Sequence, residues 1–201
     1  MIRLPLFVVW LAAVVLSPNL AHPAEPLEAP FGVKWGLSAD EVRAIGVTLD
    51  NKKDIDCGIG FSAKQLPKIL IDVDTVELCF GYNDKLWQIR AGSIAFNNDP
   101  YASALKTRYD QIDNLLSAKY GPGKHSHYQD TELWSGPDEF LSGIENGRSW
   151  HYTNYESENV FVQLGLRASS HDTGYFVLIF ENTQLKKDFE AGKQQKEQNA
   201  L

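Results

Sequence analysis

The first folded part of the chain opens with an apolar alternation and then a helix start. Over residues 31–36 aromatic or apolar residues alternate with Gly or Lys, which is typical of a short extended segment. Ser38 stands three residues before Glu41, the spacing of a capping box in which each side chain satisfies a backbone N–H of the other residue. The pattern predicts a short helix that ends near Gly46, and it gives Glu41 a structural task.

Alternating apolar positions predict six strands, three on each side of a long helix. The strand signals cover residues 57–65, 74–82 and 85–96 in the first half and residues 148–156, 159–167 and 174–181 in the second. The segment 174–181 is apolar on both faces, as a central strand covered by a helix should be.

The long helix is marked by its ends and by its apolar stripe. Asp99 and Pro100 favour a helix start, and Gly121 with Pro122 favours a stop. Between them, apolar residues recur at steps of three or four: Leu105, Tyr109, Ile112, Leu116 and Tyr120. A final helix is expected after Asn182, whose side chain can cap it.

These elements predict an α+β fold. Their order reads as two α-β-β-β units, and we expect one antiparallel sheet with the helices packed on one face. At 201 residues the chain is long enough for one domain, which we place at residues 25–195, with a polar tail at 196–201 that should fray.

The N-terminus has the pattern of a secretory signal. Arg3 precedes an apolar run, Leu4 to Leu16, which is shorter than the ~20 residues that span a bilayer. We expect residues 1–24 to be removed, with an uncleaved anchor as the alternative. No cysteine lies near the cut, so the sequence predicts a periplasmic or secreted protein without a stable membrane anchor.

The charge balance narrows the range of partners. Without Arg3, 18 basic residues face 26 acidic ones, a net charge of −8. This balance opposes binding to nucleic acid and to anionic lipid surfaces. No cluster of Lys and Arg interleaved with aromatic residues offsets it.

Cys57 and Cys79 are the only cysteines, and export would place them in an oxidising compartment. If they face each other across a hairpin, its turn is centred at Lys68, where the two strand signals are interrupted. The sequence therefore predicts a structural disulfide. Buried free thiols and catalytic thiols are the alternatives, although the spacing is far from the C-x-x-C of redox-active pairs.

Motifs of known chemistry are missing from the sequence, and no cofactor is predicted. It contains no nucleophile elbow, no phosphate-binding loop and no H-E-x-x-H zinc motif. Two acidic pairs, Asp54 with Asp56 and Asp72 with Asp74, lie where turns are expected, and Asp favours turns by bonding its own backbone.

Histidines give the strongest hint of a metal. His125 and His127 form an H-x-H, which on a strand puts both imidazoles on one face as half of a zinc or copper site. Asp130 follows closely, whereas His151 and His171 are remote in the sequence. The alternative is a polar loop that happens to contain two histidines, and we assign no metal site.

The region 122–147 is longer than the connections usual in compact domains, and such segments are often functional. It carries aromatic residues, which are enriched in interfaces, and we select Tyr128, Trp134 and Phe140 as the candidate binding surface. The alternative is that Trp134 and Phe140 only cover one end of the core.

Four segments carry a resemblance to known proteins: "WGLSADEVRAIG", "YNDKLWQI", "LLSAKYGPG" and "YFVLIFEN". They resemble a broad group of small exported bacterial proteins that includes the SmpA/OmlA outer-membrane-assembly lipoproteins, and the fold of the β-lactamase inhibitor protein. The resemblance implies fold and compartment. The matching residues are caps and turns, so no site residue is carried over, and the acylated cysteine of the lipoproteins is missing.

Three functions are compatible with the sequence. The leading hypothesis is a non-enzymatic module that binds another envelope protein through its sheet face or long loop. The alternative is an enzyme or metal-handling protein with a His/Asp site around residues 125–130. A third is a small-ligand carrier with a groove lined by Trp87, Trp150 and Tyr152.

Overall fold

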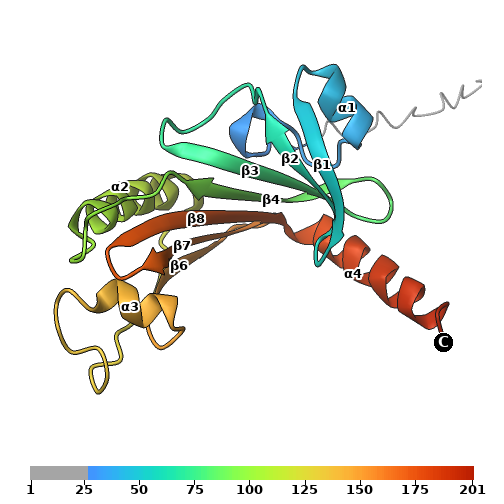
Figure 1. Ribbon diagram of the computed structural model, residues 1–201. Coiled ribbons are helices and arrows are strands. Elements are labelled where there is room, and N and C mark those ends of the chain that lie inside the picture. The colour runs from blue at the N-terminus through green and yellow to red at the C-terminus, as the bar shows by residue number, and fades with distance from the viewer. Residues whose placement is uncertain (1–26) are drawn as a thin grey trace, which may run out of the picture.

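The structure is a computed structural model that describes residues 27–201, so the predicted signal at residues 1–24 lies outside the described residues. Eight strands form one antiparallel sheet in the order β1-β2-β3-β4-β8-β7-β6-β5 (Figure 1). The α+β class predicted from the sequence is confirmed. No helix of the described residues is long and apolar enough to cross a membrane.

Residues 27–201 form five helical elements and eight strands. The helical elements are η1 (Pro30–Gly32), α1 (Ala39–Ala44), α2 (Ser103–Tyr120), α3 (Phe140–Glu145) and α4 (Thr183–Gln198). The strands are β1 (Thr48–Ile55), β2 (Gly58–Lys64), β3 (Val73–Phe80), β4 (Leu86–Ser93), β5 (Lys124–Tyr128), β6 (Trp150–Glu156), β7 (Val160–Ser170) and β8 (Thr173–Asn182).

Four strands precede α2 and four follow it, so the two predicted units of three strands are not confirmed. The strands missing from the prediction are β1 and β5, the two edges of the sheet. Both are polar and mostly exposed, so neither carries the apolar alternation by which a half-buried strand is recognised.

The main core lies between α2 and one face of the sheet. Leu105, Tyr109 and Ile112 of α2 are almost fully buried, as the apolar stripe predicts. They share a core with alternate residues of β8, among them Leu178 and Phe180. The helix starts later than expected, because the Asp99 carboxylate accepts bonds from the backbone N–H groups of residues 103–105.

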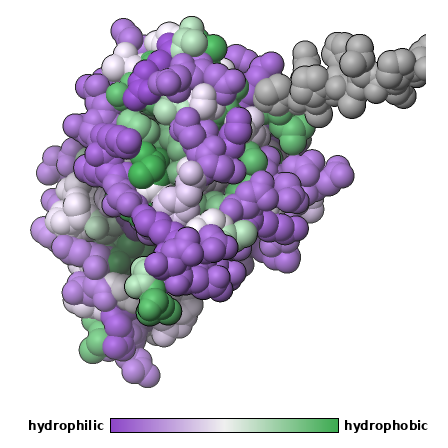
Figure 2. Space-filling model, turned by 90° about the vertical axis from the view of Figure 1, so that its right-hand side faces the viewer, coloured by the Kyte–Doolittle hydropathy of each residue, from purple (hydrophilic) through white to green (hydrophobic). Residues whose placement is uncertain are grey.

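The helix α4 packs on the opposite face of the sheet, which corrects the prediction that all helices share one face. Its Phe189 stacks on Trp87 at 4.7 Å and joins a separate cluster with Cys57 and Cys79. Cys79 lies between Leu78 and Phe80 on β3, and both of these residues belong to the main core. Because successive side chains of a strand point to opposite faces, Cys79 points away from α2. Figure 2 shows the side from which α4 projects, where hydrophilic residues cover most of the surface and hydrophobic residues gather in smaller patches.

The predicted disulfide is confirmed, but its place in the sheet differs. Cys57 and Cys79 are bonded to each other, with Cα atoms 5.8 Å apart. In the register of β2 and β3, Gly60 rather than Cys57 lies opposite Cys79. Cys57 lies in the β1–β2 turn, so the bridge ties this turn to β3 beneath α4.

Candidate functional site

Three histidines form a row at the β5 edge, on the face of the sheet that α2 covers. His125 and His127 lie on one face of β5, as the H-x-H pattern predicts, with ring centroids 5.5 Å apart. His151 of β6 lies directly opposite His127, and the two rings stack with centroids 3.6 Å apart. The sequence did not show that His151 joins this pair.

A polar network connects the histidine row to α2. Thr153 Oγ1 lies 2.9 Å from His125 Nδ1 and 2.6 Å from the hydroxyl of Tyr109. Tyr155 donates its hydroxyl to Asp113, whose carboxylate lies 4.0 Å from His125 Nδ1. Burial raises the pKa of both tyrosines, so their hydroxyls remain protonated and able to donate.

Burial keeps two of the histidines uncharged at neutral pH. It is the main cause that lowers the pKa of His151 to about 4, with smaller contributions from His127 and Lys106. Burial also lowers the pKa of His127. Because neither ring carries a charge at neutral pH, the two can stack without electrostatic repulsion.

The histidine row does not form a ready metal site. The three imidazoles do not bring one nitrogen each within 4.8 Å of the other two. Among the described residues, only Cys57, Glu77 and Cys79 meet that spacing, and the two sulfurs are bonded to each other.

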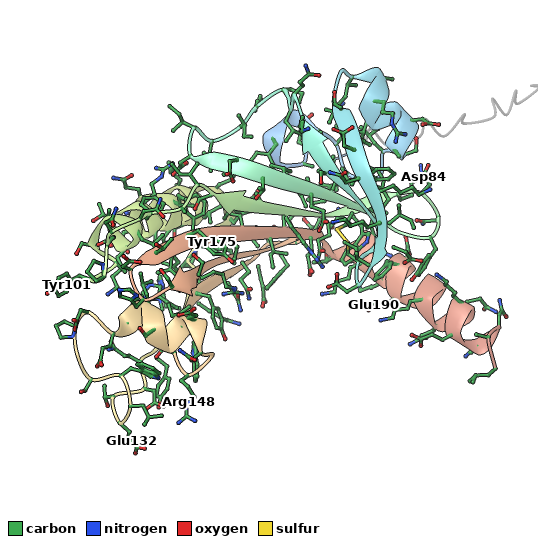
Figure 3. The ribbon with its side chains drawn as sticks, viewed as in Figure 1. Asp84, Tyr101, Glu132, Arg148, Tyr175 and Glu190 are labelled. Atoms are coloured by element: carbon green, nitrogen blue, oxygen red, sulfur yellow. A yellow bond between two sulfur atoms is a disulfide. The ribbon has the colours of Figure 1, made fainter. Side chains whose placement is uncertain are left out.

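Asp130, the acid of the predicted His/Asp site, has another task. It is 4% exposed, and its carboxylate accepts a bond from Arg148 Nε at 2.9 Å. Its backbone N–H donates to the Ser149 hydroxyl. The residue therefore closes the loop between β5 and β6, which Arg148 and Glu132 mark in Figure 3. The acid that approaches the histidines is Asp113.

The candidate surface residues of the long loop differ in exposure. Tyr128 is 47% exposed and stacks on Trp150 at 4.5 Å. Phe140 is buried in the core, with Lys106 Nζ 3.9 Å from its ring centroid, and Trp134 is half-buried beside Gly143. Of the three, Tyr128 alone is exposed.

Tyr128 belongs to a larger surface, which we call the open face. It is the side of β3, β4 and β5–β8 that points away from α2, and α4 covers only its end at Trp87. The register places these side chains on it: Thr75, Glu77, Arg90, Tyr128, Trp150, Tyr152, Phe161, Gln163, Arg167, Tyr175, Val177 and Ile179. All are partly or fully exposed, and Tyr175 is labelled on β8 in Figure 3.

The centre of the open face is hollowed. Val177 of β8 is paired with Gly92 on one side and with Gly165 on the other. A Cβ at Gly92 would lie 2.6 Å from Thr75 Oγ1, so a side chain at this position would displace the Thr75 hydroxyl. The result is a shallow groove of about 430 Å³ over β3, β4 and β8, with Arg90 on its lining.

Arg167 also lines this groove, and its charge is unpaired. The other four arginines of residues 27–201 each form an ion pair with a carboxylate: Arg43, Arg90, Arg108 and Arg148. Arg167 instead donates to its neighbour's backbone carbonyl, Leu166 O, at 2.9 Å and remains exposed. The alternation in residues 159–167 already placed Arg167 opposite the apolar side of its strand, but sequence reasoning did not select it.

The aromatic residues of the third hypothesis do not line one groove. Trp87 is buried under α4, where its indole N–H donates to the Cys57 carbonyl at 2.9 Å. Trp150 and Tyr152 lie on the open face, near the sheet edge.

Comparisons with protein-family models, with curated proteins and with solved structures gave no significant match. The geometry of the chain's own residues is therefore what bears on its function. Two features carry chemical information: the histidine row, whose nitrogens do not converge, and the open face, which joins exposed aromatic rings to an unpaired guanidinium.

Proposed function

We propose that this chain is a non-enzymatic binding module of the bacterial envelope, and that its open face receives a segment of another envelope protein. The observation that carries the proposal is the unpaired Arg167 in a groove that the half-buried Tyr175 also lines. The exposed rings of Tyr128 and Trp150 lie on the same face, toward the sheet edge. Tyr, Trp and Arg are the residues on which binding energy concentrates at protein interfaces. The central hollow over Val177 gives space for a partner side chain.

The chemistry of the open face specifies the partner. An exposed guanidinium pairs best with a carboxylate, which it can hold by two parallel bonds. Val177, Ile179 and Phe161 offer half-exposed apolar contacts around it. We therefore propose a partner segment with apolar side chains and one Asp or Glu aimed at Arg167.

Three observations support the envelope as the compartment. The disulfide is typical of oxidising compartments, and the first residues have the pattern of a secretory signal. The resemblance to exported proteins of the SmpA/OmlA kind points in the same direction, at the level of fold.

Photo-crosslinking in cells tests the proposal. A benzophenone amino acid is placed at Tyr152 or Tyr175 on the open face, or at Tyr101, a tyrosine that is 54% exposed elsewhere. We expect one adduct of defined mass from the open-face positions and none from Tyr101. With the partner identified and purified, Arg167→Gln should raise the Kd at least about tenfold, and Arg167→Lys less.

Two results would overturn the proposal. One is adduct formation from Tyr101 with the same partner and the same yield as from the open face. The other is an unchanged Kd for Arg167→Gln with the purified partner.

A metal-handling role is a second candidate, favoured by the clustering of three imidazoles, His125, His127 and His151, at one edge of the sheet. Rotation of the stacked rings would be needed to direct their nitrogens at one ion. Calorimetry with Zn²⁺ alone tests this role. Binding should be lost in His127→Phe, which keeps a ring that can stack but removes the nitrogens, and it should be retained in His171→Gln, a change in the β7–β8 turn. Absence of Zn²⁺ binding in the native chain would remove this candidate.

A further inference from the structure

A second groove lies on the other face of the sheet, beside α2. It has a volume of about 270 Å³ and is bounded by α2, by η1 and by the loop between β2 and β3. Its lining is mostly apolar, with Leu178 and Phe180 of β8 contributing from the sheet. Ile112 and Leu116 line it from α2, and Leu70 lines it from the loop.

The walls of this groove are fixed by backbone contacts. Lys68 of the β2–β3 loop donates its backbone N–H to Phe31 O at 3.1 Å. Gly32 has a φ of +80°, and a Cβ there would lie 2.8 Å from the Cβ of Pro67, so loop and turn are in close contact. The groove therefore exists before any ligand arrives.

The mouth of the groove exposes apolar side chains to water. Leu115 of α2 is 60% exposed and Ile69 of the loop is 53% exposed, and both line the groove. Large exposed apolar residues that converge on a concave site are typical of a ligand-binding groove.

The charged residues of this groove are of one sign. Lys68 and Lys119 line it, and no acidic residue does. Among the ion pairs of the described residues, neither lysine takes part in one. This is unusual for a chain with a formal net charge of −7, and it makes the groove locally positive.

We infer that this groove binds a free single-chain amphiphile with an anionic head group. The alkyl chain lies between the exposed side chains of Ile69 and Leu115. Below it, the buried side chains of Leu178 and Phe180 form the floor of the groove. The head group lies between the ammonium groups of Lys68 and Lys119. The occupant is a monomeric carboxylate or phosphate monoester. It is not a membrane surface, because the net negative charge of the chain opposes adsorption to anionic lipid.

Calorimetric titration of the intact chain with octanoate, decanoate and dodecanoate tests the inference. Each added methylene should lower the Kd about threefold to fourfold until the groove is filled. Decyltrimethylammonium has a ten-carbon chain but a cationic head, and should bind at least about tenfold more weakly than decanoate. Backbone NMR shifts on decanoate addition should lie in α2, in residues 65–72 and around Leu178.

Matched variants assign the binding to this groove. Leu115→Asp puts a carboxylate at the mouth and should raise the Kd for decanoate at least about tenfold. Leu133→Asp is the control, because Leu133 has the same exposed fraction of 60% in the loop between β5 and β6. Replacing Lys68 and Lys119 by Gln should weaken decanoate binding and leave decanol binding unchanged, whereas Lys193→Gln should change neither.

Several results would overturn the inference. These are equal affinity for the anionic and cationic amphiphiles, equal effects of Leu115→Asp and Leu133→Asp, and NMR shifts confined to the open face. Binding to anionic phospholipid vesicles without binding of decanoate would assign the groove to a membrane surface. A concentration-dependent dimer that Leu115→Asp abolishes, without decanoate binding, would assign it to a second copy of the chain.

Discussion

His127 and His151 stack face to face across β5 and β6, with their ring centroids 3.6 Å apart. Tyr109 of α2 contacts the His151 ring edge-on, with the two ring centroids 4.6 Å apart. Phe140 of α3 contacts the same ring edge-on. Around this stack lie the charged or titratable groups of Lys106 and Asp113 on α2 and of His125 on β5. The burial that lowers the pKa of His151 has a consequence for stability in mild acid.

We expect the chain to lose stability as the pH falls below about 6.5. In the unfolded chain His151 takes up a proton near pH 6.5, but in the folded chain only near pH 4. Between pH 6.5 and pH 4, proton uptake by His151 therefore favours the unfolded chain. At pH 5 this uptake lowers the free energy of unfolding by about 1–2 kcal/mol. Above pH 7 this contribution to the free energy of unfolding is constant.

Urea unfolding at pH 7.5 and pH 5 measures this effect. In His151→Gln, the free energy of unfolding should differ much less between the two pH values than in the native chain. In His171→Gln the difference should remain, because His171 is exposed in the β7–β8 turn. Equal pH dependence in both variants would show that burial of His151 is not the cause.

The second prediction concerns the disulfide under α4. Closing a loop between residues 22 positions apart should stabilise the fold by about 3 kcal/mol in the chain-entropy model. Cys57→Ala with Cys79→Ala should lower the free energy of unfolding by this order while the sheet still forms. Urea midpoints of the native chain with and without reductant provide the comparison. A native chain whose midpoint is insensitive to reductant would contradict the prediction.

The disulfide also shows what the sequence could and could not predict. The cysteine count and the expectation of export were sufficient to predict the bond, since neither depends on register. The register itself was wrong, because the hairpin argument placed Cys57 opposite Cys79 where the structure places Gly60. Cys57 lies in a turn that follows β1, and β1 carries no apolar alternation to reveal it.

The same limit applies to the candidate sites. The H-x-H pattern fixes the common face of His125 and His127, because side chains alternate along a strand. His151 is separated from them by a loop that contains α3, and no local pattern determines which residue of β6 faces which residue of β5. Likewise, the apolar residues of α4 predict burial of Phe189 but not the face of the sheet on which it is buried.

The third prediction is that Ser38→Ala lowers the free energy of unfolding by about 1 kcal/mol. The predicted capping box is confirmed: the Ser38 backbone N–H donates to Glu41 Oε2 at 2.7 Å, and the Glu41 N–H donates to the Ser38 hydroxyl at 3.3 Å. Ser103→Ala at the first residue of α2 is the control and should be near neutral. Crosslinking from the open face should be unchanged in both variants, and its loss in Ser38→Ala alone would place Ser38 in a site.

The last prediction concerns Asp72, for which the sequence suggested only turn formation. Its carboxylate pairs with the guanidinium of Arg108 through two hydrogen bonds, and it is only 9% exposed. The bonds from Arg108 lower the pKa of Asp72, so the pair stabilises the folded chain above the ordinary pKa of Asp. This stabilisation is lost as the pH falls through the lowered value.

Asp72→Asn should therefore lower the free energy of unfolding at pH 7 by about 2 kcal/mol, because it leaves Arg108 without its partner. Asp74→Asn is the matched control, since Asp74 is exposed and should be near neutral. Urea midpoints decide between a structural pair and a simple turn residue, and equal midpoints for the two variants would support the turn.

The pair also joins the end of the β2–β3 loop to α2, the two walls of the apolar groove. Asp72→Asn should consequently weaken decanoate binding even at temperatures where the variant remains folded, whereas Asp74→Asn should leave the Kd unchanged.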